Sequence, residues 1–170
     1  MAIKIRLLRT LARSRRERHA VGPFLCTVAA TFLMLAGSNA RAQTAQDPKS
    51  AAAIRAVIEA QAAAWNRGDV AAYMDGYDRS PNTEFVGGDS ITRGWQQVLD
   101  RYKQRYDSRE KMGTLTFSDL EITVLSDDAA LVLGRWHLKR ATDEPHGTFT
   151  LLFRKTKVGW RIVHDHTSSA

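Results

Sequence analysis

The stretch TFTLLFRKTKVGWRIVHDHT, residues 148–167, decides the fold of this 170-residue chain. Apolar residues recur at alternate positions of its first half, in Phe149, Leu151 and Phe153. Alternation with a period of two is typical of a strand that buries one face, and the segment Lys157-Val158-Gly159 supplies a turn. The stretch therefore predicts an antiparallel hairpin whose second strand runs from Trp160 to Thr167.

The register of this hairpin determines which side chains of its second strand face inward. His164 and His166 share one face of that strand, and Asp165 lies on the other. If Lys155 pairs with Trp160, the two histidines join the phenylalanines on the inner face. A slip of one residue brings in Asp165 instead, and the sequence is compatible with both registers.

Two further hairpins are predicted upstream of this one. Residues 115–124 and 130–139 alternate in the same way, with turn residues at 126–128 and 143–147. The alternation changes phase at Ser118-Asp119-Leu120, which indicates a β-bulge. Together with the last hairpin, these segments predict an antiparallel meander of four long strands.

Helical periodicity precedes the strands. A stripe of apolar residues predicts a helix over residues 51–67, with Ser50 as its N-cap and Gly68 as its terminator. Asp69 is expected to cap a short second helix through Tyr77, and a third helix follows Gly94 and ends near Tyr106. Residues 83–86 are expected to form a short strand before a glycine turn. Helices followed by a bent antiparallel sheet predict an α+β domain with a pocket between the two layers.

Four segments, in this order, resemble the nuclear transport factor 2-like superfamily. They are Trp65-Asn66-Arg67-Gly68-Asp69, Thr92-Arg93-Gly94, Ser126-Asp127-Asp128-Ala129-Ala130 and the closing run Gly159-Trp160-Arg161-Ile162-Val163-His164-Asp165-His166-Thr167-Ser168. Residues 51–170 are most similar to its SnoaL-like, ketosteroid isomerase-like bacterial domains. The closing run also resembles the association domain of calcium/calmodulin-dependent kinase II.

The resemblance implies a cone-shaped fold in which a curved antiparallel sheet wraps around N-terminal helices and a deep, mostly apolar cavity. It also implies a homodimer joined through the sheets. It does not imply a single reaction, because the superfamily includes isomerases, dehydratases, cyclases and scaffolds, so that function has to be argued from the site.

The steroid-isomerase mechanism is not expected to carry over. The resemblance implies an Asp base on the first strand after the helices, with a Tyr on the first helix and a protonated Asp holding the oxyanion. Here Phe85 and Val86 stand at the corresponding strand positions, and Gln61 replaces the tyrosine. Glu84 is adjacent but points to the other face of a regular strand.

The candidate catalytic residues are His166, Asp165 and His164, because imidazole titrates near neutral pH and can act as an acid or a base. The same motif also fits structural pairing or a dimer contact. A third interpretation is metal binding, to which His137 and His146 could add ligands, but no third ligand is fixed by spacing. The sequence therefore predicts no metal site, and it predicts no cofactor because nucleotide fingerprints and phosphate loops are lacking.

Six residues are expected to line a ligand pocket. Aromatic rings offer a large apolar surface, and Tyr and Trp add a polar tip; the alternative for each residue is an ordinary place in the core. The six residues are Tyr73, Phe85, Tyr102, Trp136, Leu151 and Trp65.

The first 42 residues have the layout of an export signal. They carry eight Lys or Arg and one acidic residue, which accounts for the whole net charge of +7, so a nucleic-acid partner is not expected. An apolar run at 24–36 precedes Ala40-Arg41-Ala42, a pattern that predicts cleavage after Ala42. The run would span about 20 Å as a helix, which is short for a stable membrane anchor in a core of about 30 Å. We expect a periplasmic or secreted protein, with the general secretory route favoured over twin-arginine export.

Cleavage would also remove Cys26, the only cysteine of the chain. Residues 43–50 are then expected to form a flexible linker before a single domain at 51–170. The expected function is binding of a small apolar molecule, with acid–base turnover of isomerase, dehydratase or hydrolase type as an open question. The alternative is a non-catalytic dimeric scaffold.

Overall fold

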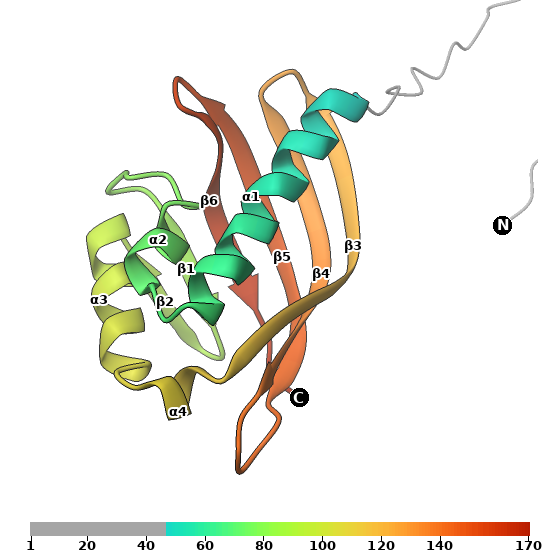
Figure 1. Ribbon diagram of the computed structural model, residues 1–170. Helices are drawn as coiled ribbons and strands as arrows, with labels where there is room; N and C mark the ends of the chain where they lie inside the picture. The colour runs from blue at the N-terminus through green and yellow to red at the C-terminus, as the bar shows by residue number, and fades with distance from the viewer. Residues whose placement is uncertain (1–46) are drawn as a thin grey trace, which may run out of the picture. The chain divides into compact units, whose positions relative to one another are not determined.

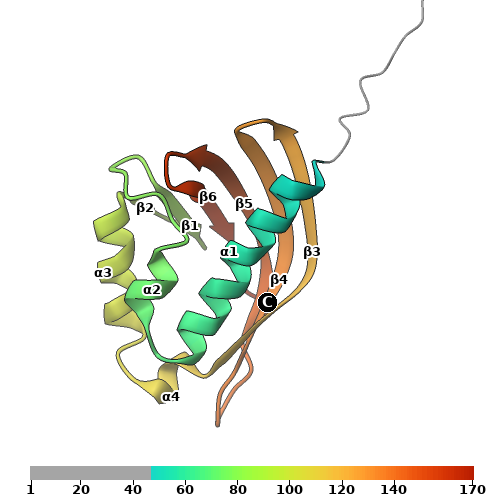
Figure 2. The same cartoon turned by 45° about the horizontal axis from the view of Figure 1, so that its top comes forward.

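The computed structural model describes residues 47–170, which form four helices and six strands around one core. In chain order these elements are α1 (Pro48–Asn66), α2 (Val70–Met74), β1 (Glu84–Gly87), β2 (Ser90–Arg93), α3 (Trp95–Arg105), α4 (Arg109–Met112), β3 (Thr114–Ser126), β4 (Ala129–Lys139), β5 (His146–Thr156) and β6 (Gly159–Thr167). The strands make a single curved sheet in the order β2-β1-β6-β5-β4-β3, and α1 crosses its concave face (Figures 1 and 2). The predicted α+β architecture is confirmed.

The predicted leader and residues 43–46 of the predicted linker lie outside the described residues. Within residues 47–170, the structure contains no helix with the length and apolar character needed to cross a membrane.

The first helix begins earlier than its hydrophobic pattern predicted. Asp47 is the N-cap, and its carboxylate accepts hydrogen bonds from the backbone N–H groups of Lys49 at 3.1 Å and Ser50 at 3.3 Å. Pro48 occupies the first helical position, where its fixed φ is favourable and its missing N–H costs nothing. Ser50, the predicted N-cap, is therefore a buried residue inside the helix, and residues 48–50 are not part of a linker.

The second helix ends at Met74 rather than at the predicted Tyr77, because the chain leaves it to pair with β6. Gly76 accepts a hydrogen bond from the Ile162 N–H, and the Asp78 N–H donates to the Ile162 carbonyl, both at 2.9 Å. Gly76 is required here, since a Cβ at this position would lie 2.5 Å from the Gln61 side chain. This contact fixes the end of α2 against the sheet.

The predicted meander of four long strands is confirmed as β3 to β6. The phase change in β3 is a bulge, with a register shift between Ser118 and Glu121 and a positive φ of 51° at Asp119. The strand β1 extends this sheet by pairing in parallel with β6, so the sheet is mixed rather than wholly antiparallel. The unpredicted strand β2 pairs with β1 across a two-residue turn, and it is too short to show a period in the sequence.

The hairpin of β5 and β6 combines both registers that the sequence left open. Lys155 pairs with Trp160 beside the turn, as in the first alternative. A β-bulge then inserts Val163 as an extra residue, and Asp165 pairs with Leu151, as in the second alternative. The bulge thus reverses which side chains of β6 face inward.

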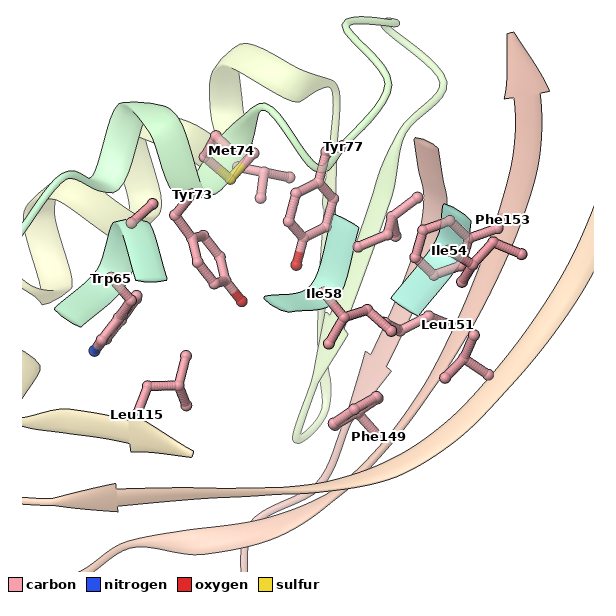
Figure 3. Close-up of a cluster of buried hydrophobic side chains, with 14 of the residues drawn as sticks. Ile54, Ile58, Trp65, Tyr73, Met74, Tyr77, Leu115, Phe149, Leu151 and Phe153 are labelled. Carbon is pink, nitrogen blue, oxygen red and sulfur yellow. The ribbon is translucent and has the colours of Figure 1, made fainter. Parts of the chain in front are cut away.

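The core lies between α1, the region around α2 and the concave face of the sheet (Figure 3). Ile54 and Ile58 of α1 pack with Phe153 and Leu151 of β5, and all four side chains are buried. Gly134 of β4 makes room for this layer, because a Cβ there would lie 2.5 Å from the Phe149 ring.

Candidate functional site

A cavity of about 310 Å³ lies between the concave face of the sheet and the helices α1 and α3. All six residues predicted to line a pocket contribute to its wall: Tyr73, Phe85, Tyr102, Trp136, Leu151 and Trp65. The wall also includes Tyr77 and five residues that the sequence did not single out for the pocket, namely Tyr106, Phe117, Thr167, Arg101 and Arg105.

Aromatic side chains from the helices make one side of this wall. The Trp65 ring is in edge-to-face contact with Tyr73 at 5.2 Å and with Tyr106 at 4.7 Å between ring centroids. The Trp65 indole N–H donates to the Met112 carbonyl at 3.0 Å, which ties α1 to α4 and fixes the ring. Figure 3 shows Tyr73 and Tyr77 pointing from the helical layer toward Phe149 of the sheet. The wall is therefore rigid and largely apolar.

A single carboxylate interrupts the apolar lining. Asp165 of β6 is 3% exposed, and among residues 47–170 it is the only acidic side chain that lines the cavity. The Tyr77 hydroxyl donates to Asp165 Oδ2 at 2.6 Å, and the Thr167 hydroxyl donates to Oδ1 at 2.7 Å. Each oxygen keeps a further lone pair that can accept a hydrogen bond from a ligand.

Burial has the largest effect on the pKa of Asp165. It raises the pKa of Asp165, because the ionised carboxylate loses its hydration, while the hydrogen bonds from Tyr77 and Thr167 act in the opposite direction. Burial and the nearby Asp165 charge both raise the pKa of Tyr73 and of Tyr77, so that these phenols keep their protons at neutral pH. The arrangement can take up or deliver one proton at the buried Asp165.

The structure separates the three predicted catalytic residues. Asp165 faces the cavity, whereas His164 and His166 lie on the outer face of the sheet because of the bulge at Val163. His164 Nδ1 lies 3.1 Å from Glu84 Oε2 on that outer face, and His166 is exposed. Of the two faces of this strand, the structure thus places the one with Asp165 and Thr167 at the cavity, and neither imidazole lines it.

The residues that replace the steroid-isomerase machinery have structural roles. Gln61 is buried, and its side-chain amide donates to the Tyr73 carbonyl at 3.1 Å. Glu84 turns away from the cavity, as the regular strand predicted, and forms an ion pair with Arg93 at 2.9 Å. Phe85 lines the cavity at the position expected for the catalytic base.

The other histidines that were considered as metal ligands pair with each other beside the loop of the β4–β5 hairpin. The His137 and His146 rings are 6.3 Å apart, and His137 Nε2 lies 3.3 Å from Glu144 Oε2. In residues 47–170, no three side chains of His, Cys, Asp or Glu are arranged to hold a metal ion.

Sequence reasoning missed Tyr77 as the partner of Asp165. These two residues are 88 positions apart, and Tyr77 was grouped with Tyr73 on one helix that in fact ends before it. The only sequence signal was the aromatic residue itself, next to Gly76. Thr167 lies on the same face of β6 as Asp165 and donates to its carboxylate. One of the two registers that the sequence left open already placed both residues on the inner face.

Residues 54–170 match the model of a family described as a SnoaL-like domain. Among solved structures, the chain is similar to a nuclear transport factor 2-like protein of unknown function from Shewanella oneidensis, with 41% identity, coverage of 69% of this chain and 98% of that chain, and a TM-score of 0.67. It is similar in fold to a nuclear transport factor 2-like superfamily protein from Salmonella enterica, with 23% identity, coverage of 71% and 91%, and a TM-score of 0.59. A ketosteroid isomerase-like protein from Erwinia carotovora has 22% identity, coverage of 69% and 94%, and a TM-score of 0.57. No functionally curated protein matches this chain.

Proposed function

This chain belongs to the SnoaL-like domain family, and from that premise we propose that it binds a small, largely apolar molecule in the cavity between its sheet and its helices. The observation that carries the proposal is the buried Asp165, held by Tyr77 and Thr167 in the wall of a cavity of about 310 Å³. A buried carboxyl group costs free energy that a purely structural core avoids. An apolar pocket with a few convergent polar groups is the usual form of a ligand site.

We further propose that Asp165 acts as a general acid or base when the ligand is turned over. Its raised pKa brings it closer to the neutral range in which a carboxyl group exchanges protons efficiently. The Tyr77 hydroxyl would hold the carboxyl group in place during the proton transfer. The ligand atom that reacts has to approach one of the free lone pairs of Asp165.

Native mass spectrometry tests the binding proposal directly. The protein that begins at Gln43, purified from its own compartment, is expected to release a defined small molecule on denaturation. The variant Leu138→Phe, which places a larger side chain in the cavity wall, should lose that molecule, whereas Val158→Phe, at an exposed residue outside that wall, should retain it. An empty wild-type protein that shows no thermal stabilisation by neutral aromatic probes would refute the proposal.

The catalytic part has a separate test. Asp165→Asn preserves the shape of the side chain and one acceptor oxygen, and its NH2 group can donate to a hydroxyl that turns to accept, but it cannot exchange a proton at neutral pH. Once the released molecule is identified, this variant should bind it and fail to convert it. Equal conversion by the variant and the wild type would refute the catalytic role of Asp165 and leave the binding proposal standing.

A homodimer through the outer face of the sheet is also proposed. Leu131 and Leu133 of β4 are 39% and 45% exposed there, and Leu131 pairs with the half-buried Leu152. In β6, His164 pairs with Leu152, so the histidines continue this surface and fit the dimer-contact interpretation of their motif. This surface also supports the alternative of a dimeric scaffold with an unused cavity.

Size-exclusion chromatography with light scattering tests the dimer. Leu133→Glu is expected to give a monomer, because it places a charge in an apolar contact. Val158→Glu is the matched control, since Val158 is an exposed apolar residue at the turn between β5 and β6. A wild-type monomer, or a dimer that tolerates Leu133→Glu, would contradict the proposed interface.

Export remains a proposal that rests on residues 1–42. It is supported by the basic start, the apolar run at 24–36 and the Ala-x-Ala pattern that ends at Ala42. N-terminal sequencing of protein from the periplasm or the medium should begin at Gln43. An intact Met1 in that fraction would refute cleavage.

A further inference from the structure

Two arginines of α3 line the cavity on the same side. Arg101 and Arg105 are four residues apart, so they are neighbours on one helix face. Arg101 is half-buried and Arg105 is exposed, whereas the carboxyl group of Asp165 is buried. The positive charges therefore lie where the cavity meets solvent.

The Arg101 guanidinium is held in place by neutral groups. Its Nη1 donates to Ser90 Oγ at 3.1 Å and to Thr92 Oγ1 at 3.2 Å, both on β2. Its Cζ lies 5.2 Å from the centroid of the Phe85 ring, another cavity residue. Nη2 is directed toward Gly87, where a Cβ would lie 3.8 Å away. The guanidinium is thus oriented before any ligand arrives, with donors left over.

Neither arginine forms an ion pair within residues 47–170, although Arg79, Arg93 and Arg154 each pair with a carboxylate. The Arg105 guanidinium instead lies 5.8 Å from the Tyr106 ring centroid. Two like charges one helical turn apart repel each other, so this pair destabilises the folded protein when no ligand is bound. An anion bound between them would remove this repulsion.

We propose that the ligand of this cavity is a carboxylic acid with a cyclic apolar body, whose carboxylate binds Arg101 and Arg105 at the mouth. This inference rests on the proposed function and adds the chemical class of the ligand. A planar guanidinium matches a carboxylate through two parallel hydrogen bonds. The Asp165 charge repels a second carboxylate, so the anionic end stays at the mouth and the apolar body points inward.

The cavity volume limits the size of that body. A cavity of about 150 Å³ holds one benzene ring, and the cavity here is about 310 Å³. A body of two fused rings therefore fits.

The test compares 2-naphthoate with 2-naphthamide, which has the same shape and no charge. Binding is measured by isothermal titration calorimetry on the protein that begins at Gln43. We expect 2-naphthoate to bind at least tenfold more tightly than the amide. This preference should fall to less than threefold in the double variant Arg101→Gln/Arg105→Gln, while the affinity for the amide stays within threefold of the wild type.

Lys103→Gln is the control for charge, because it removes one positive charge from the same helix at an exposed residue outside the cavity wall. It should keep the preference for the acid. Equal affinities for acid and amide in the wild type would overturn this inference and leave the binding proposal standing. A preference that survives in the double arginine variant would overturn it as well. Failure of both compounds to bind would count against both proposals.

Discussion

The hydrogen bond between Tyr77 and Asp165 is the contact whose removal tests the site most directly. In Tyr77→Phe the ring and its packing remain, but the hydroxyl that donates to Asp165 Oδ2 at 2.6 Å is lost. A buried acceptor that loses a bond to a charged group costs about 1.5–3 kcal/mol of unfolding free energy. For a domain of this size, that corresponds to a fall in Tm of roughly 6–12 °C.

The same change has a consequence for titration. The Tyr77 hydroxyl lowers the pKa of Asp165 against the larger effect of burial, so Tyr77→Phe should raise that pKa further. The assay is urea unfolding at neutral pH, followed by NMR titration of the Asp165 carboxyl carbon. Tyr106→Phe is the control, since the Tyr106 hydroxyl has no hydrogen-bond partner within residues 47–170, and it should change stability by less than about 0.5 kcal/mol.

A double-mutant cycle shows whether the loss belongs to this pair. In the background Asp165→Leu there is no carboxylate to leave unpaired, so Tyr77→Phe should cost less than about 0.5 kcal/mol there. An equal cost in both backgrounds would refute the reasoning, because the hydroxyl would then contribute through something other than Asp165.

Three other outcomes are expected from the same structure. Because burial raises the pKa of Asp165 above its ordinary value of 3.8, the folded state holds this proton more tightly. Stability should therefore fall, relative to Asp165→Asn, as the pH rises from about 3.8 through the folded-state pKa, which a series of urea titrations checks. Gly76→Ala should cost about 1–3 kcal/mol, since its Cβ would overlap the buried Gln61; wild-type stability by thermal unfolding would contradict this. Asp47→Ala should lose about 1 kcal/mol in chemical denaturation through the missing N-cap, and an unchanged midpoint would indicate that α1 begins elsewhere.

Much of the fold was predictable because its signals are local. The alternation in β3 to β6 and the phase change at Asp119 follow from which side chains are apolar, and these features are confirmed. The start of α1 was misjudged because Asp47 and Pro48 act through the backbone and leave no trace in hydrophobic periodicity. The parallel pairing of β1 with β6 joins distant segments, and no local pattern specifies it.

For the pocket, too, some features follow from the sequence and others from the tertiary structure. By itself the sequence determined an α+β domain and the aromatic residues of the cavity wall, because periodicity and residue type are properties of each segment. Only the tertiary structure decided which residues of the last strand face that wall. Both registers of the hairpin satisfied the local alternation, and the choice depended on the bulge at Val163 and on a hydroxyl partner for Asp165 from Tyr77, 88 positions away. A buried carboxyl group is stable only where such partners converge, and their convergence is a property of the assembled layers rather than of the strand.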